Sequence, residues 1–423
     1  MMTISLSFLI LLFAAAEPIQ QTDDSSLLLS RSCDKYSSDF GRVCPSFLKI
    51  ENERPLVITS DNFNGDVTVQ EISETTIRPL GKLVRPSDVD AIFRWWSSFV
   101  IDNTPYFATF VNQLSHKDGS AKIRVFTMSL ESGYLSEVAS FNVPLPKDKY
   151  KGFGSTETFC VKDVVPVGNA TYMALGTYYE IHWRPLGFLS GEHPVFNKVF
   201  SVLLNSRTGL YPKFVAEEGR FSILSMNFEC DLTNRMIYAA WVHDPSRVGV
   251  KTKFAQTVCY SKSIVDGTWT SPTNVFTSEK SLNDQIRTIQ NLQNKNEQYI
   301  IFSTEDNKLY VWRSEGREWK QASVLENIPW SRSVTRRDYW KDFKATITND
   351  GMLCLCLATN DGILLRIFYD GLWECASLLF RPPSGPSLAD FKITNDGIAD
   401  ILYINKQSGD LTCYYRRVCL PNS

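Results

Sequence analysis

The four histidines of this sequence are candidates for metal binding or acid–base chemistry. All four fall in or at the edge of three polar connections between β-rich runs: His116, His182, His193 and His243. Convergence of these imidazoles with Glu192, Asp118 and Asp244 would form a zinc or catalytic site. The alternative, which we favour, is that surface connections are polar and these histidines are ordinary surface residues. We therefore expect no metal and no cofactor, and keep the four histidines as candidate ligand contacts.

A second candidate for chemistry is the segment from Ile328 to Asp342, which is rich in aromatic and basic residues. Its candidate ligand-binding residues are Trp330, Arg332, Arg336, Arg337, Tyr339 and Trp340. Aromatic faces stack on sugar rings or anchor a protein partner, and guanidinium groups bind carboxylate or phosphate through paired hydrogen bonds. The alternative is that the two tryptophans pack in the core while the arginines are solvated.

The ten cysteines are a third candidate, and we expect them to form disulfides within and between neighbouring strands. Two pairs lie near the ends of the chain: Cys33 and Cys44, then Cys413 and Cys419. A disulfide between these pairs could join the two ends, although two local bridges fit the sequence equally well. The Cys354-Leu-Cys356 run has no basic neighbour that would lower a thiol pKa, so we reject a catalytic thiol.

The elements that must position these residues are short β-rich runs separated by turn residues, and helical periodicity is almost absent. Residues 298–325 and 352–380 follow one pattern of three strands and two turns. Glycine turns followed by an aromatic residue recur at Gly133-Tyr134, Gly209-Leu210-Tyr211, Gly267-Thr268-Trp269, Gly316 to Trp319, and Gly371-Leu372-Trp373. In each we expect the glycine to supply a positive φ and the ring to cover the edge of a sheet.

Such repeats predict an all-β fold, a single β-propeller of seven four-stranded blades, with six blades as the alternative. The propeller is expected over residues 51–423, and the segment 17–50 is expected to hold a strand around Phe47 to Ile50 that closes the ring. Only Gln20 to Ser32 are expected to be disordered. The connections between the second and third strands are long in units two to four: Asn112 to Ala121, His182 to Phe196, and His243 to Val250. Long connections of this kind usually carry binding.

Residues Asp361 to Trp373 resemble a blade of the fungal fucose-specific lectins, which are six-bladed propellers. Their blades repeat D-G-x-L-R-E-x-x-Y-D-G-x-x-W, in which the Arg and Glu hold the sugar. The matching positions here are Leu365 and Arg366, so the Arg/Glu pair is missing. The resemblance covers two units at best and implies the architecture more than fucose binding.

Residues Thr394 to Asp400 resemble the calcium loop of integrin-type propeller repeats, D-x-N-x-D-G-x-x-D. Asp396 and Asp400 match two ligand positions, but Lys392 occupies the first and would oppose a cation. A plain Asn-Asp-Gly turn is the favoured interpretation.

Some propellers hydrolyse glycosides with two or three carboxylates near the axis. Asp163, Asp284 and Asp342 are candidates, although no spacing motif distinguishes them. The sequence has no nucleophile elbow, His-Glu-x-x-His helix or phosphate loop. We favour a non-enzymatic recognition protein that binds a glycan or an extracellular protein through one loop face. An extracellular glycoside hydrolase and a structural or matrix protein are the alternatives.

The start of the chain predicts secretion. Residues Ile4 to Ala16 form a short apolar run that ends in small residues, which indicates a signal peptide over residues 1–16. The sequon Asn169-Ala170-Thr171 would carry an N-linked glycan. No later run is long enough for a transmembrane segment. A net charge of −2 provides no basic field for nucleic acid. We expect a secreted, extracellular monomer.

Overall fold

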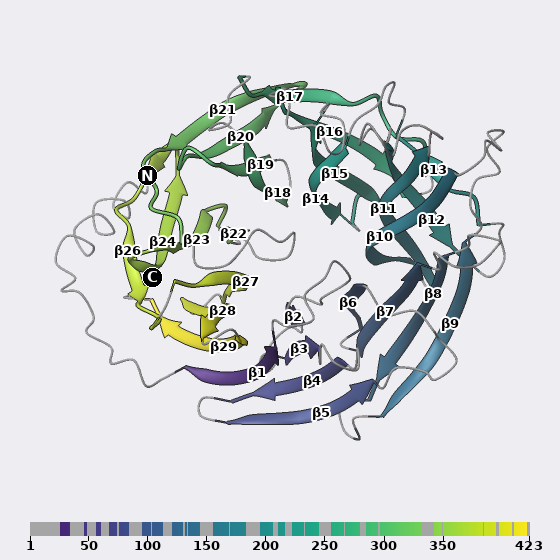
Figure 1. Cartoon of the computed structure of the whole chain (residues 1–423), viewed down its shortest axis with the longest axis horizontal. Coiled ribbons are helices and arrows are strands. Elements are labelled where there is room, and N and C mark those ends of the chain that lie inside the picture. The colour runs from purple at the N-terminus through teal and green to yellow at the C-terminus, as the bar shows by residue number, and fades with distance from the viewer. Residues whose placement is uncertain are drawn as a thin grey trace, which may run out of the picture.

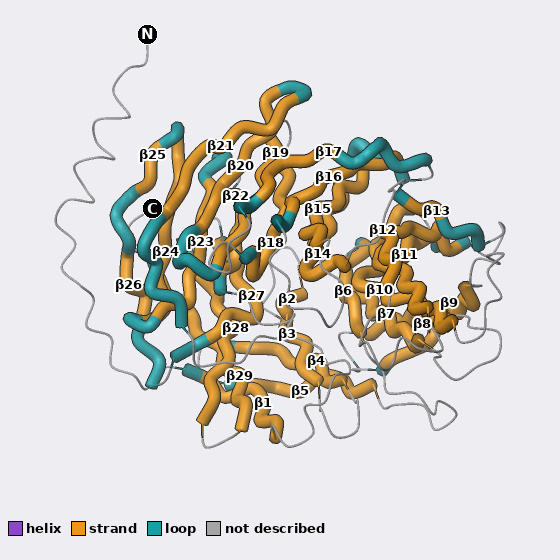
Figure 2. The backbone as a smooth tube through the Cα atoms, turned by 45° about the horizontal axis from the view of Figure 1, so that its top comes forward, coloured by secondary structure: helices purple, strands orange, loops and turns teal. Residues whose placement is uncertain are grey.

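The computed structural model describes these residues: 26–33, 46–48, 56–60, 67–73, 76–83, 95–102, 104–112, 121–129, 132, 134–143, 155–168, 170–182, 195–205, 210–215, 222–231, 233–244, 255–265, 267–279, 285–294, 297–331, 342–348, 350–383, 385–394, 397–407 and 410–420. Figure 2 shows strands joined by loops and turns, with no helix in this part of the chain. None of the described residues therefore forms a helix long and apolar enough to cross a membrane.

The strands form seven antiparallel sheets arranged as blades around an axis (Figure 1). Blade 1 contains β2 (Ser46–Leu48), β3 (Leu56–Ser60), β4 (Val67–Ile72) and β5 (Ile77–Leu83). Blade 2 contains β6 (Trp95–Ile101), β7 (Thr104–Asn112), β8 (Ala121–Met128) and β9 (Leu135–Val143). Blade 3 contains β10 (Ser155–Gly168), β11 (Thr171–His182), β12 (Val195–Leu204) and β13 (Lys213–Phe214).

The remaining blades repeat this order. Blade 4 contains β14 (Ser222–Asp231), β15 (Met236–Asp244), β16 (Thr257–Ile264) and β17 (Thr273–Thr277). Blade 5 contains β18 (Ile286–Asn294), β19 (Glu297–Thr304), β20 (Leu309–Glu315) and β21 (Glu318–Leu325). Blade 6 contains β22 (Phe343–Ile347), β23 (Leu353–Thr359), β24 (Gly362–Tyr369), β25 (Leu372–Trp373) and β26 (Ser377–Phe380). Blade 7 contains β27 (Ser387–Ile393), β28 (Ile398–Gln407), β29 (Asp410–Cys419) and β1 (Leu27–Cys33). The prediction of a seven-bladed, all-β propeller is confirmed.

The ring is closed by the first described strand, because β1 pairs with β29 and completes blade 7. The expectation that residues 47–50 would close the ring is wrong, since Ser46–Leu48 is instead the innermost strand of blade 1. The expected disorder over Gln20 to Ser32 is also wrong from Leu27 onward. Leu29 on β1 is buried, and it packs with residues of blades 7 and 1.

The expected disulfide framework is not found in the described part of the chain. Cys230, Cys354, Cys356, Cys375 and Cys419 are present as thiols. Closure of the ring therefore does not use a disulfide from Cys419. It uses an antiparallel ladder in which Ser30 lies opposite Cys413 and Cys33 lies opposite Asp410.

Apolar residues fill every seam between neighbouring blades. Seven buried clusters occur in the described chain, one for each pair of adjacent blades. A blade is apolar on both faces, so it buries them only by stacking against two neighbours. This requirement explains why the ring must close.

The outermost strand of each of six blades begins near an apolar residue that packs onto the preceding blade. These residues, here called the outer anchors, are Ile77, Leu135, Leu210, Trp269, Trp319 and Trp373. The indole Nε1 of Trp269 donates to Ser201 Oγ at 2.9 Å, and that of Trp373 donates to Ser323 Oγ at 2.6 Å.

The expectation that the hairpin aromatic covers the sheet edge is confirmed for the tryptophans and wrong for the two tyrosines. Tyr134 is 71% exposed and Tyr211 is 77% exposed. Their neighbours Leu135 and Leu210 are the outer anchors of those blades. Successive side chains on a strand point to opposite faces, so a shift of one residue changes which side chain is buried.

Candidate functional site

The innermost strands of the seven blades lie nearest the axis (Figure 1). Each of them carries one polar residue at the same position. These residues, here called the inner polar ring, are Ser46, Ser97, Asp163, Asn227, Gln290, Lys344 and Asp390. The residues opposite them on the second strands are all at most 1% exposed: Ile58, Ala108, Leu175, Ala240, Ile301, Cys356 and Leu402. The common register and burial show that the seven positions are structurally equivalent.

Four members of the inner polar ring form hydrogen bonds with the backbone of the next blade. Gln290 Nε2 donates to the Ala345 carbonyl at 2.8 Å, and Gln290 Oε1 accepts from the Ala345 amide at 2.9 Å. Asn227 Oδ1 accepts from the Asn291 amide at 2.7 Å. An innermost strand has one edge without a strand partner, so these side chains replace the missing ladder bonds.

The same direction of bonding recurs at two more seams. Ser97 Oγ accepts from the Val164 amide at 2.8 Å, which joins blade 2 to blade 3. Asp390 Oδ2 accepts from the Phe47 amide at 2.9 Å, which joins blade 7 to blade 1. We call these four side chains, which make five hydrogen bonds to the backbone of the next blade, clasps.

Asp163 and Asp342, two of the carboxylates considered for hydrolysis, are both engaged in contacts between blades. Asp163 Oδ1 accepts from the Ser97 hydroxyl and from the amide of Val164. Asp342 is bound bidentately by Arg287, with both N–O distances 2.9 Å. Ser303 Oγ also donates to Asp342 Oδ2 at 3.0 Å. The third candidate, Asp284, lies outside the described residues.

The long connections leave the sheets at one end of the propeller. In a meander of antiparallel strands, the second-to-third connections and the blade-to-blade connections emerge at the same end, here called the loop face. The predicted long segments do join second to third strands, at β7–β8, β11–β12 and β15–β16. The same connection is short at β19–β20 and β23–β24.

The structure places two of the four histidines at this end. His243 is half-buried on β15 next to Asp244, and burial lowers the pKa of its imidazole, while Asp244 opposes that change. His182 is the last residue of β11, opposite Ser155. His116, His193 and the sequon residue Asn169 lie outside the described residues. Within the described ranges, no group of three or more His, Cys, Asp or Glu residues could hold a metal ion.

Gln256 is a residue of this end that sequence reasoning missed. It is 2% exposed, and its side chain donates to Asp244 Oδ2 at 3.2 Å and accepts from the Ile286 amide at 2.8 Å. Its own amide donates to Ser278 Oγ at 2.9 Å. Gln256 therefore connects blade 4 to the first residue of blade 5, next to His243.

The aromatic and basic segment is described only at its two ends. Trp330 is 1% exposed and packs in the cluster between blades 5 and 6, so its ring does not present a face to solvent. Its backbone bridges to Thr359. Arg332, Arg336, Arg337, Tyr339 and Trp340 lie outside the described residues. The end of the segment, Asp342, is held by Arg287.

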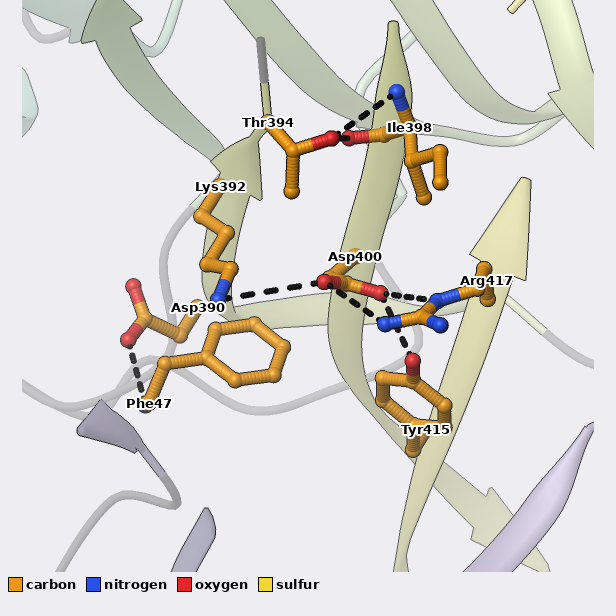
Figure 3. A network of polar contacts seen from close by, with 8 residues as sticks. All are labelled: Phe47, Asp390, Lys392, Thr394, Ile398, Asp400, Tyr415 and Arg417. Carbon is orange, nitrogen blue, oxygen red and sulfur yellow. Dashed lines mark hydrogen bonds and ion pairs between the residues drawn. The ribbon is translucent and has the colours of Figure 1, made fainter. Parts of the chain in front are cut away.

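The segment that resembles a lectin blade and the segment that resembles a calcium loop both have structural roles in the described chain. Leu365 is buried between blades 6 and 7, and Arg366 Nη1 donates to the carbonyl of Glu374 at 2.8 Å. Asp400 is fully buried, where Tyr415 OH donates at 2.6 Å and Arg417 Nε at 2.9 Å, and these contacts occupy the carboxylate (Figure 3). Gly397, with φ +70°, closes the turn between β27 and β28, as expected for an Asn-Asp-Gly turn.

The sequence matches no protein-family model and no curated protein. The structure is similar to puromycin hydrolase, with a TM-score of 0.50 and 10% identity over 87% of this chain and 51% of that chain. It is also similar to an α-L-arabinofuranosidase from Fusarium graminearum (TM-score 0.47, 7% identity, 93% of this chain, 97% of that chain). A third similarity is to Chaetomium thermophilum Raptor (TM-score 0.46, 9% identity, 90% of this chain), of which this chain spans 28%. At 10% identity the similarity to puromycin hydrolase shows the fold alone. The seven blades define the class: the protein is a β-propeller.

Proposed function

We propose that this protein is a secreted recognition protein that binds a glycan or a protein ligand through the loop face of its propeller. The observation that carries the proposal is that the polar side chains near the axis bond neighbouring blades, whereas the long connections lie together at the loop face. Polar groups near the axis are used to tie blades together, while the extra chain length lies in the second-to-third connections of blades 2, 3 and 4. A rigid scaffold with long connections at one end is the usual arrangement for binding.

Glycoside hydrolysis is the competing class of function. It requires one carboxylic acid and one carboxylate on either side of the scissile bond. Asp342 forms an ion pair with Arg287, and Asp163 accepts hydrogen bonds from Ser97 and from the amide of Val164. This bonding suits a structural role better than proton transfer, and it favours the recognition proposal.

The test is binding of the recombinant protein to a glycan array, with two variants compared. In the first variant, residues 184–193 of the long blade 3 connection are replaced by Asn-Gly. In the matched control, Tyr134 and Tyr211, which are exposed on hairpins at the opposite end, are both changed to Ser. We expect the first variant to lose at least about tenfold in affinity, about 1.4 kcal/mol, and the control to bind like the parent.

Equal binding by the loop variant, with loss in the tyrosine variant, would contradict the assigned face. If the parent protein binds no glycan on the array, the glycan part of the proposal is excluded and a protein ligand remains. Turnover of fluorogenic glycosides that is abolished by Asp284→Asn would overturn the recognition proposal in favour of a hydrolase.

A further inference from the structure

Within the described residues, three Asp-Gly dipeptides occupy turns of blade 6. They are Asp350-Gly351 between β22 and β23, Asp361-Gly362 between β23 and β24, and Asp370-Gly371 between β24 and β25. All three aspartates are exposed. Asp and Gly are favoured in turns, but a glycine has no side chain to shield its backbone nitrogen. This nitrogen can attack the side chain of the preceding aspartate, so each dipeptide is a candidate for spontaneous modification.

Two of the three glycines are held in place by the surrounding structure. The Gly351 amide donates to the Thr348 carbonyl at 3.0 Å. Gly362 pairs with Thr359 in the β23–β24 ladder and is buried. A side chain on Gly362 would collide with the carbonyl oxygen of Phe380, so this peptide is closely packed. Attack by either nitrogen therefore requires the turn to open first.

The third glycine, Gly371, is not held in this way. Asp370 and Gly371 are the central residues of a two-residue hairpin, with φ of +50° and +81°, and the pair Tyr369–Leu372 closes it. In the described chain, the Gly371 amide donates no backbone hydrogen bond. Gly371 is exposed, and a Cβ built on it would meet nothing within 4 Å. Its nitrogen can therefore approach the Asp370 side chain without breaking a hydrogen bond or displacing a neighbour.

We propose that Asp370 is a site of spontaneous isoaspartate formation, and that this modification loosens the outer edge of blade 6. The Gly371 nitrogen attacks Cγ of Asp370, and the new C–N bond closes a succinimide ring. The hydroxyl of the carboxyl group leaves with the amide hydrogen as water. Water then adds to either ring carbonyl, which restores aspartate or gives isoaspartate, whose main chain passes through Cβ and Cγ. One water is released and one is consumed, so no other reactant is needed.

Isoaspartate adds one carbon to the main chain of this turn, and turn length sets the register of a hairpin. The β24–β25 ladder contains the pairs Tyr369–Leu372 and Phe368–Trp373. The indole of Trp373, an outer anchor, donates to Ser323 Oγ of blade 5 at 2.6 Å. A longer turn displaces Trp373 from this position. The hairpin lies at the end opposite the loop face, so the effect is independent of the ligand that the loop face binds.

The first test is incubation of the folded protein for several weeks at neutral pH and physiological temperature. Digestion and electron-transfer fragmentation then distinguish isoaspartate from aspartate at each site. We expect isoaspartate to form at Asp370 at least about fivefold faster than at Asp350 or Asp361, where hydrogen bonding or packing holds the glycine. In denatured protein, the control, the three sites should react at similar rates. Similar rates in the folded protein would overturn the proposal.

Two matched asparagine variants sharpen the comparison, because asparagine closes the same ring faster, with ammonia as the leaving group. Asp370→Asn and Asp361→Asn each place Asn-Gly in a hairpin of blade 6. Asparagine is favoured in such turns, so both variants should keep the fold. We expect Asp370→Asn to deamidate at least about tenfold faster than Asp361→Asn in the folded protein. Equal rates would contradict the choice of Asp370 as the reactive site.

Hydrogen exchange tests the structural consequence. In the isoaspartate form, separated from the parent by ion exchange, residues 368–373 should lose protection, while residues 121–128 of blade 2 should keep it. Asp370→Glu, which would have to close a larger ring, should keep its protection after the same incubation. Unchanged exchange over residues 368–373 in the isoaspartate form would show that the modification does not loosen blade 6.

Discussion

Individual side chains in this propeller form hydrogen bonds with the backbone of the neighbouring blade. Gln290 shows the principle, because both of its side-chain polar atoms bond the peptide groups of a single residue, Ala345, in blade 6. A buried backbone group left without a partner costs about 1–3 kcal/mol. Satisfaction of the backbone at the edge of the neighbouring blade therefore explains the polar side chains of Ser97, Asn227, Gln290 and Asp390.

The cysteines provide a prediction at the same scale. Burial raises the pKa of the Cys354 thiol to about 12, from an ordinary value of 9.0, and burial raises the pKa of Cys356 as well. Cys375 and Cys419 are exposed thiols. Iodoacetamide at about pH 8, without reductant, should alkylate Cys375 and Cys419 in the folded protein and leave Cys354 and Cys356 unmodified. Peptide mass spectrometry checks this pattern.

Denatured protein treated in the same way is the control, and all four thiols should react. Reaction of Cys375 or Cys419 only after reduction would show that a disulfide is present. The raised pKa of Cys354 also sets a direction for stability. The neutral buried thiol stabilises the fold below about pH 9, and this contribution is lost as the pH rises toward about 12.

At the scale of the element, the outer hairpins differ in what their aromatic residues do. Trp269 is buried between blades 3 and 4 and donates to Ser201, whereas Tyr211 on the neighbouring blade is mostly exposed. Both follow a glycine turn at the start of an outermost strand. Their roles differ because the register of each hairpin decides which side chain points at the preceding blade.

Replacement of these two aromatics should therefore have unequal effects. Trp269→Ala removes a buried indole and its hydrogen bond and should lower the free energy of unfolding by about 3–5 kcal/mol. Tyr211→Ala, the matched control, should change it by less than about 0.5 kcal/mol. Urea denaturation followed by circular dichroism measures both values. Equal effects would contradict the assignment of Trp269 as an outer anchor.

For the whole molecule, stability depends on closing the ring with a strand from the opposite end of the chain. β1 contributes six residue pairs to its ladder with β29 and buries Leu29. Without it, blade 7 would have three strands and an unpaired edge at β29. We expect closure late in folding, because the β1–β29 ladder pairs residues from opposite ends of the described chain and such non-local contacts form slowly.

Truncation tests this dependence. A chain that begins after Cys33 lacks β1 and should lose about 3 kcal/mol or more, since each ladder hydrogen bond contributes about 0.5–1.5 kcal/mol. A chain that begins at Ser26 keeps the strand and is the control. Chemical denaturation compares the two. Equal stability would mean that β1 does not close the ring in solution.

Local pattern was sufficient to predict the architecture. The tight turn at Asp370-Gly371 has φ of +50° and +81°, as its sequence requires, and such turns mark off the strands of a blade. Repetition of one strand and turn pattern then predicts a propeller, because a lone blade cannot bury both faces. The long connections of blades 2 to 4 were also predicted, although most of their residues lie outside the described chain.

Only the tertiary structure decided how the ring closes and what the axis contains. The bond between Phe47 and Asp390 joins residues separated by 343 positions, and no local pattern specifies such a contact. The inner polar ring likewise has no sequence signature, since its seven members span serine, aspartate, asparagine, glutamine and lysine. The amino-acid order determines strands and turns through neighbouring residues, whereas the partner of an edge strand is set by whichever blade the closed ring brings beside it.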